Sequence, residues 1–417
     1  MSLPTPATSA LAPPRPAGRP LRIGIEAQRL FRPHKHGMDI VALELIRNLQ
    51  QLDLENEYFI FVKPDADHGV LQETANFHIV PVPGGPYPLW EQVLLPRAVR
   101  KAGVDLLHCT SNTAPLNAGV PLVLTLHDII YLEPLDLRRG SWYQRAGNLY
   151  RRWNVPRVLP RCERVLTVSA FEQARIEQRL PATQGRVEVV YNSAGEQFRR
   201  ITDPAVLAAA RARYQLPERF VFFLANTDPK KNLRGVLQAM ALLKKQGQLP
   251  FKLVMLDYPE SALQAVLNEL QAPELRADIQ LCGYVPNQEL PLLYNLAEIF
   301  LYPSLRESFG IPILEAMGCG TPVITSNTSS MPEVAGDAAL LIDPFRPETI
   351  ADAIRQLQNN SAERARLTEL GLQRVQRFSW RETARHVREV YRQVLTQQPN
   401  HPGKPQARAA QQAAPGK

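Results

Sequence analysis

The sequence is poor in cysteine and lacks long apolar runs. Its four cysteines are Cys109, Cys162, Cys282 and Cys319. They are scattered and form no Cys-x-x-Cys pair, which disfavours a zinc site or a disulfide framework and favours buried thiols in a reducing compartment. No stretch approaches the ~18 consecutive apolar residues that a membrane-spanning helix needs. Residues 1–20 contain no apolar segment typical of a secretory signal, so we expect a disordered leader and a cytoplasmic protein.

Acidic residues are outnumbered: 48 Lys and Arg stand against 40 Asp and Glu, a formal net charge of +8. The excess is densest from Arg138 to Arg164, where eight arginines accompany one acid, Glu163. Two interpretations of this segment stay open: a solvated helical face, or a patch that attracts anionic lipid headgroups or a phosphorylated acceptor. No motif that recognises DNA or RNA accompanies the arginines, so we do not expect nucleic acid as a partner.

Short apolar segments alternate with helical patterns from residue 21 onwards. The expected strands are 21–27, 58–62, 78–82, 106–109, 122–126, 165–169 and 187–191, and then 220–225, 252–256, 279–282, 299–301, 322–324 and 339–342. This alternation is typical of parallel βαβ units, and it restarts after a seam near 196–218. We therefore predict an α/β protein with two doubly wound, Rossmann-like domains.

Two glutamates, Glu307 and Glu315, lie eight residues apart across an expected loop-to-helix junction. Pro312 can occupy the first turn of that helix, where its missing N–H costs nothing. The free backbone N–H groups at such a helix start would face an anion. The junction therefore has the form of a site for a sugar nucleotide.

The segment Pro303-Ser-Leu-Arg-Glu-Ser-Phe-Gly310, continued by Glu315-Ala-Met-Gly-Cys-Gly-Thr-Pro-Val-Ile-Thr, resembles the Glu-x7-Glu signature of the family 4 retaining glycosyltransferases, in particular the mannosyltransferase-like group 1 enzymes. The resemblance implies the GT-B fold, in which two Rossmann-like domains face a central cleft. It implies an acceptor domain at 21–198, completed by a C-terminal helix at 379–396, and a nucleotide-sugar donor domain at 199–378. We expect a disordered tail at 397–417.

The resemblance also implies roles for the residues around the junction. Glu315 would accept hydrogen bonds from the ribose hydroxyls, and Glu307 would hold hydroxyls of the transferred sugar as a catalytic residue. Ser308 and the backbone N–H groups of Phe309 and Gly310 would approach the sugar or the diphosphate. The alternative, two unrelated surface carboxylates, does not account for the matching block downstream.

Other donor-binding residues are expected in two loops that follow strands. Lys231 precedes a helix and resembles the lysine of the family's Lys-Asn-Leu segment, where it would face the diphosphate, whereas Lys230 would face solvent. Asn226 stands near the position where the family usually has an arginine; it offers an amide hydrogen bond but no charge, so donor affinity or donor choice can differ. Tyr284 and Val285 would bring backbone groups against the nucleotide base.

On the side of the N-terminal domain, His127 ends an expected strand, where open α/β sheets place their ligands. Its His-Asp segment resembles that of the family, which implies that His127 touches the donor sugar as the second catalytic residue. Gly37 would allow the diphosphate or the acceptor to approach the backbone closely, although a glycine in a flexible loop is an equal alternative. Asp39 replaces a second glycine often found there. Trp90-Glu-Gln also resembles a family segment, with Trp90 either in the core or under the acceptor.

No metal ion is expected. Asp65-Ala-Asp67 matches the metal-binding signature of the other large glycosyltransferase fold, but it follows a strand of the wrong half, and a turn rich in aspartate explains it. The nucleotide-diphosphate sugar is then a co-substrate, and no cofactor is expected.

The predicted function is transfer of a hexose, first of all mannose from GDP-mannose, to a saccharide or lipid-linked saccharide acceptor, as in the assembly of cell-surface polysaccharide. Three alternatives stay open: a transferase that uses a UDP-hexose, a phosphorylase or synthase on the same fold, and a catalytically degenerate protein that binds a nucleotide sugar. The expected partners are the donor and the acceptor. Under the second interpretation of the arginine-rich segment from Arg138 to Arg164, it would also contact an anionic membrane, and the protein would lie at the inner face of that membrane.

Overall fold

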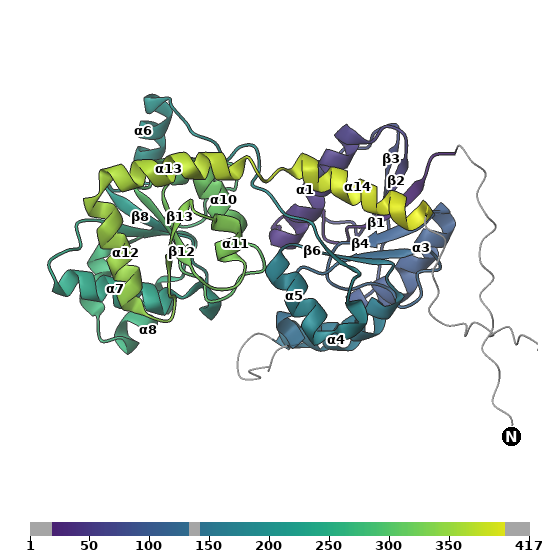
Figure 1. The fold of residues 1–417 in the computed structure, drawn as a ribbon, viewed down its shortest axis with the longest axis horizontal. Coiled ribbons are helices and arrows are strands. Elements are labelled where there is room, and N and C mark those ends of the chain that lie inside the picture. The colour runs from purple at the N-terminus through teal and green to yellow at the C-terminus, as the bar shows by residue number, and fades with distance from the viewer. Residues whose placement is uncertain (1–18, 133–141, 397–417) are drawn as a thin grey trace, which may run out of the picture.

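Two parallel β-sheets, one in each half of the chain, organise the structure (Figure 1). The computed structural model describes residues 19–132 and 142–396. The first sheet has seven strands in the order β3-β2-β1-β4-β5-β6-β7, and the second has six in the order β10-β9-β8-β11-β12-β13. Every strand pairing is parallel. The predicted fold of two doubly wound α/β halves is confirmed.

The strands of the first sheet are β1 Arg22–Glu26, β2 Glu57–Val62, β3 Phe77–Pro81, β4 Leu106–Cys109, β5 Leu122–Thr125, β6 Arg164–Thr167 and β7 Val187–Val189. The strands of the second sheet are β8 Phe220–Phe223, β9 Lys252–Met255, β10 Ile279–Leu281, β11 Ile299–Tyr302, β12 Val323–Ser326 and β13 Ala339–Ile342. Each lies within a few residues of an expected strand.

The helices of the first half are α1 Gly37–Leu52, α2 Tyr87–Leu89, the π-helical turn η2 Trp90–Leu94, α3 Leu95–Ala102, α4 Trp142–Val158 and α5 Ala170–Arg179. The helices that follow are α6 Pro204–Arg213, α7 Leu233–Lys245, α8 Glu260–Glu269, α9 Leu290–Leu296, α10 Ile311–Gly318, α11 Met331–Ala335, α12 Pro347–Asn359, α13 Ser361–Val375 and α14 Trp380–Thr396. Short 3₁₀ turns are η1 His68–Val70, η3 Ile130–Leu132, η4 Leu159–Arg161, η5 Pro181–Thr183, η6 Pro229–Lys231 and η7 Pro273–Asp278. Among the described helices, none is long and apolar enough to cross a membrane.

Strand β8 illustrates why the strands form. All four of its residues are buried. Val221 and Phe223 pack with side chains of α7 and α12, whereas Phe220 and Phe222 pack with side chains of α9 and α10. A parallel sheet that is covered by helices on both faces requires apolar residues at successive positions, which is the pattern that made these strands predictable.

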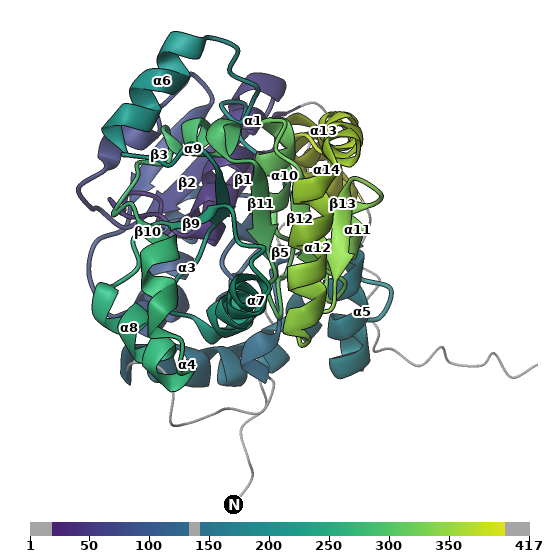
Figure 2. The same ribbon diagram turned by 90° about the vertical axis from the view of Figure 1, so that its left-hand side faces the viewer.

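The chain crosses between the two halves twice. Residues 190–203 lead from β7 to α6, and residues 376–379 lead from α13 into α14. Helix α14 then packs against α1 of the first half, and both views show the two helices near each other (Figure 1 and Figure 2). The hydroxyl of Tyr391 on α14 lies 2.7 Å from Nδ1 of the buried His108 on β4. The first half is therefore completed by the end of the chain.

Each sheet contains one point at which the strand order reverses. It lies between β1 and β4 in the first sheet and between β8 and β11 in the second. The loops that leave the carboxyl ends of such neighbouring strands diverge to opposite faces of the sheet, and the crevice between them is where open α/β folds bind ligands. The residues after β8 and β11, and after β1 and β4, are therefore the places to examine.

Candidate active site

The crevice of the second half holds an ion pair between Lys231 and Glu307. Lys231 follows β8 and Glu307 follows β11, and the lysine Nζ lies 2.6 Å from Oε1 of the glutamate. The two side chains are only 14% and 11% exposed. The lysine also donates to the hydroxyl of Tyr302, 3.0 Å away. The sequence placed both residues near the donor; their direct contact is a feature that the structure adds.

The charges around Glu307 keep it ionised. Burial by itself would raise the pKa of this carboxyl, but the positive charges of Lys231 and Lys230, together with the hydrogen bond from Lys231, lower the pKa below its usual value. The site therefore presents a carboxylate and an ammonium group side by side in a protected environment. Such a pair can bind hydroxyl groups through the carboxylate and phosphate oxygens through the ammonium group.

The backbone around Glu307 is fixed by two serines from the segment after β12. The N–H of Glu307 donates to Oγ of Ser329 over 3.1 Å. The hydroxyl of Ser330 lies 2.9 Å from the carbonyl oxygen of Glu307 and 3.0 Å from that of Phe309. Phe309 itself is buried in the core. The loop therefore holds its carboxylate in one position.

Helix α10 begins as the sequence predicted. Gly310 precedes it with φ of 102°, a conformation that only glycine adopts readily, and Pro312 lies in the first turn. Glu315 on this helix accepts a hydrogen bond of 2.9 Å from the hydroxyl of Tyr294. Burial raises the pKa of Glu315 to about 7, so its carboxyl is balanced between its neutral and ionised forms near neutral pH.

Two residues near Lys231, Lys230 and Asn226, are more exposed than Lys231 is. Lys230 is more exposed, at 38%, and approaches Asp228 only at 3.9 Å, in agreement with its expected position at the surface. Asn226 is exposed as well, and its Oδ1 accepts from the N–H of Asp228 over 3.0 Å. The side-chain oxygen of Asn226 therefore stabilises the turn, and its role in donor binding stays a prediction.

The two residues expected beside the base lie on opposite sides of their loop. Val285 is buried in the core, whereas the side chain of Tyr284 is 65% exposed. The Tyr284 ring meets the ring of His34, from the first half, edge to face with 6.4 Å between centroids. This contact joins a loop of each half.

His127 follows β5 in the first half and is buried. Its Nε2 lies 2.9 Å from the carbonyl oxygen of Thr110, which can only accept, so Nε2 carries the proton. Burial lowers the pKa of His127, so the ring is neutral and its Nδ1 is an acceptor. No hydrogen bond among the described residues joins His127 to Glu307. The two residues predicted to be catalytic thus belong to different halves.

Gly37 is the first residue of α1. A Cβ atom at this position would meet no other atom within 4 Å, so the packing of the chain itself does not require glycine there. Asp39 accepts from the N–H of His36 over 2.9 Å and thereby stabilises the start of the helix. The close approach of a ligand to Gly37 stays a prediction.

The sequence analysis missed a polar network at the crevice between β1 and β4. Glu91, fully buried, accepts hydrogen bonds from the hydroxyls of Tyr87, Thr113 and Tyr150. Burial raises the pKa of Glu91. The only signal of this network in the sequence was the resemblance of residues 90–92 to a family segment. The partners of Glu91 are spread over about sixty residues, so its hydrogen bonds could not be inferred from that segment. Trp90 belongs to the core, with its Nε1 donating to the carbonyl oxygen of Val82 over 2.7 Å.

Glu26, at the end of β1, lies in the same crevice and is also buried. Its Oε1 accepts from the N–H of Gln28 over 2.9 Å, and its Oε2 from the N–H of Thr110 over 3.3 Å. Burial is the main cause that raises the pKa of Glu26 to about 7, and the nearby charge of Glu91 raises it as well. The first crevice therefore combines two buried carboxyls of raised pKa with hydroxyl groups.

Both aspartates of the Asp-x-Asp segment form contacts with other groups of the chain. Asp67 forms an ion pair with Lys35, and Asp65 accepts from the N–H of the next residue over 2.8 Å. Across the described ranges, no group of three or more His, Cys, Asp or Glu side chains is arranged to hold a metal ion. The segment is therefore held in place by contacts within the chain.

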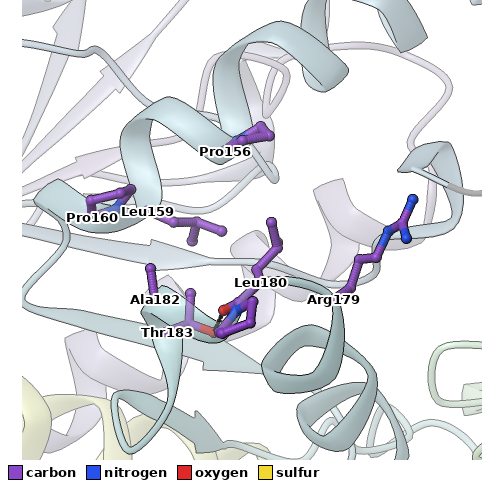
Figure 3. A pocket seen from close by; sticks show the side chains of 8 residues that line it. Pro156, Leu159, Pro160, Arg179, Leu180, Ala182 and Thr183 are labelled. Atoms are coloured by element: carbon purple, nitrogen blue, oxygen red, sulfur yellow. Dashed lines mark hydrogen bonds between the residues drawn. The ribbon is translucent and has the colours of Figure 1, made fainter.

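A cavity of about 170 Å³ lies between the end of α4 and the segment after α5 (Figure 3). It is lined by Pro156, Leu159, Pro160, Arg179, Leu180, Pro181, Ala182 and Thr183. The lining is mostly apolar and includes none of the predicted site residues. We therefore place the candidate active site at the crevices and not in this cavity.

Comparison with known proteins follows the division into two halves. The family model described as "Glycosyltransferase Family 4" matches residues 36–194, and the model described as "Glycosyl transferases group 1" matches residues 209–374. O-antigen chain mannosyltransferase B of Escherichia coli is 32% identical over 260 residues, which are 62% of this chain and 66% of that protein. The serotype-specific mannosyltransferase WbdA of Escherichia coli is 29% identical over 295 residues, 69% of this chain and 36% of that protein. The chain thus spans about two thirds and about one third of the lengths of these relatives.

Solved structures share the fold across nearly the whole chain. Sucrose-phosphate synthase from Thermosynechococcus elongatus superposes with a TM-score of 0.69 at 20% identity. The match covers 90% of this chain and 99% of that protein. This similarity establishes the arrangement of the two halves and leaves substrates to be argued from the site.

Proposed function

Because the chain belongs to the group 1, family 4 glycosyltransferases of the retaining GT-B class, we propose that it transfers a hexose from a nucleotide-diphosphate donor to a saccharide or lipid-linked saccharide acceptor. The observation that carries this proposal is the buried Lys231–Glu307 pair in the crevice of the half that matches the group 1 model. The names of the relatives in Escherichia coli favour mannose, so GDP-mannose is the donor that we propose first.

The proposed roles follow from the chemistry of each group. Lys231 stabilises the negative charge of the departing diphosphate, and Glu307 accepts hydrogen bonds from hydroxyls of the transferred sugar. Glu315 accepts from the ribose hydroxyls. The neutral His127 offers Nδ1 as an acceptor to a hydroxyl of the donor sugar. The leaving phosphate assists deprotonation of the acceptor, so that the protein mainly positions the reactants and stabilises charge.

Three alternatives are compatible with the same fold. No described side chain identifies the base, so a UDP-hexose is the next donor to consider. A phosphorylase or synthase would release sugar 1-phosphate when inorganic phosphate is added. A protein that binds a nucleotide sugar without transferring the sugar is suggested by Asn226, which carries no charge, whereas the buried Lys231–Glu307 pair favours an enzyme.

We further propose that helix α4 contacts an anionic membrane and holds the protein at its inner face. Leu149 and Trp153 on this helix are 60% and 43% exposed, and the Arg157 guanidinium lies 5.5 Å from the centroid of the Trp153 ring. Arginines attract anionic lipid headgroups, and exposed apolar and aromatic side chains beside them would enter the headgroup region. Arg138 and Arg139 of the basic segment lie outside the described residues. Flotation with anionic liposomes at low salt, lost at high salt, is expected; failure to float at low salt would refute the contact.

Calorimetric titration with GDP, UDP and ADP, without added metal, is the first test of the transfer proposal. Selective binding of GDP, followed by mannose transfer from GDP-mannose, is the expected result. Selective binding of UDP would replace the donor. If a folded sample bound none of the three, the transferase proposal would be wrong. The same transfer assay in excess chelator tests the prediction that no metal is required; a loss of activity restored by manganese would contradict it.

A further inference from the structure

The loop that carries Glu307 is held by helix α5 of the other half. Residues on both sides of Glu307 take part. The hydroxyl of Ser169 donates to the carbonyl oxygen of Ser308 over 2.7 Å. The guanidinium of Arg306 lies 3.0 Å from Oε1 of Glu172 on α5 and also covers the ring of Phe171, with 4.8 Å to the ring centroid. The loop that carries Glu307, here called the donor loop, is therefore joined to the N-terminal turn of α5 at several points.

The N-terminus of α5 is in turn bound by a second element of the other half. Glu333 on α11 accepts from the N–H of Ala170 through Oε1, over 2.8 Å, and from the N–H of Phe171 through Oε2, over 3.1 Å. The hydroxyl of Tyr191 donates to the same carboxylate over 2.8 Å. A carboxylate at this place satisfies N–H groups that have no partner within the helix and interacts favourably with the helix dipole. Both views show α11 near α5 (Figure 1 and Figure 2).

Burial distinguishes these contacts from an incidental surface ion pair. The side chain of Glu172 is fully buried, and that of Arg306 is 17% exposed. Exposed pairs contribute little because water and salt screen them, whereas removing one partner of a buried pair leaves a charge without compensation. The position of the donor loop is therefore sensitive to whether α5 is in contact with it.

We propose that α5 fixes the residues on either side of Glu307, and that Glu172 and Glu333 are positioning residues through which contact between the two domains completes the donor site. This inference rests on the transfer reaction proposed above. When the domains separate, Glu307 keeps its contacts with Lys231 and Ser329, which lie in its own half, but the residues on either side of it lose their contacts with α5. Nucleotide binding then persists while turnover is lost.

The test compares Glu333→Gln and Glu172→Gln with a matched control, Glu260→Gln. Glu260 forms an exposed ion pair with Arg276 within the second half, so the control makes the same change away from the domain contact. For both positioning variants we expect the Kd for the nucleotide to change less than about twofold and kcat to fall at least about tenfold, with the donor KM little changed. The control should match the wild type in all three. Unchanged kcat in Glu333→Gln would overturn the proposal, and this variant decides the matter if Glu172→Gln does not fold.

Hydrogen exchange of the amides of Ala170 and Phe171 provides a measurement that does not depend on activity. Both N–H groups should be protected in the wild type and exchange at least about tenfold faster in Glu333→Ala. If the wild type transfers no sugar but shows this protection, the proposed function fails while the domain contact stands. Unprotected amides in the wild type would overturn the positioning role itself.

Discussion

The two crevices have the same topology and different side-chain chemistry. After β8 and β11, the second half presents a fixed ion pair, Lys231 with an ionised Glu307. After β1 and β4, the first half presents Glu91 among hydroxyl groups and Glu26 with a pKa of about 7. Because the two sheets place the crevices alike, the side chains alone make their chemistry different. Under the proposed transfer reaction the ion pair would face the charged donor, so that one fold used twice supplies two chemically distinct crevices.

The largest effect is expected from the carboxylate of the second crevice. Glu307→Gln keeps the shape of the side chain but removes the charge that pairs with Lys231, so kcat/KM should fall about 10²- to 10³-fold. Steady-state rates with the donor identified by titration measure this. The control is Glu260→Gln, which removes the half-exposed partner of Arg276 and should have little effect. Turnover near that of the wild type in Glu307→Gln would remove the catalytic assignment of this residue.

A smaller effect is expected when the charge opposite Glu307 is removed. Lys231→Met eliminates a charged hydrogen-bond donor for the diphosphate, so the donor KM should rise about 10- to 100-fold. The pKa of Glu307 should rise too, because Lys231 is the main group that lowers it. Lys230→Met makes the same change at the neighbouring, more exposed position and should have a much weaker effect. Equal effects of the two variants would show that only the overall charge matters.

Glu26 in the first half and Glu315 in the second both have a pKa of about 7, and pH should separate their roles. If Glu315 accepts from the ribose, nucleotide binds better to its ionised form. Affinity should then rise about tenfold between pH 6 and pH 8, as the proton leaves. Calorimetry at a series of pH values measures this, and Glu315→Gln should show a flat profile. A flat profile in the wild type would contradict the ribose contact.

The smallest effect concerns stability in the first half. The folded state keeps a proton on Glu26 up to a pKa of about 7, whereas the unfolded chain releases it near the ordinary glutamate pKa of 4.5. The folded state therefore binds more protons between these values, and the contribution of Glu26 to the free energy of unfolding falls as pH rises. Relative to Glu26→Gln, the wild type should lose about 1 kcal/mol between pH 6 and pH 8. Urea unfolding at both pH values measures the difference; a constant difference would contradict the prediction.

Much of the fold could be predicted because buried parallel strands appear as continuous apolar runs. The helices α4 and α6 could not be placed in this way. Helix α4 is rich in arginine and contains Pro156, and α6 buries only Ala210, so neither has a clear apolar face. These helices are stabilised by the tertiary contacts of a few residues more than by a local apolar pattern. Such contacts cannot be read from a single sequence.

In the candidate site, too, local features could be predicted from the sequence and long-range contacts could not. Glu307, Gly310 and Glu315 were predictable because they lie in one short segment whose geometry is set by a glycine, a proline and a helix start. The network around Glu91 joins residues that are distant in sequence, and only the packing of the sheet and its helices brings them together. Long-range contacts of this kind, like the one between Glu333 and α5, follow from tertiary structure.

The return of α14 to the first half has a consequence for biosynthesis. The ribosome releases the chain from its N-terminus, so β1 to β7 emerge roughly 190 residues before α14, a delay of roughly 10–40 s at ordinary rates of elongation. During this time the face of α1 that receives Ala384, Val387 and Tyr391 has no cover. The second half, continuous from α6 to α13, is complete earlier. The domain that is translated first is therefore the one that finishes folding last.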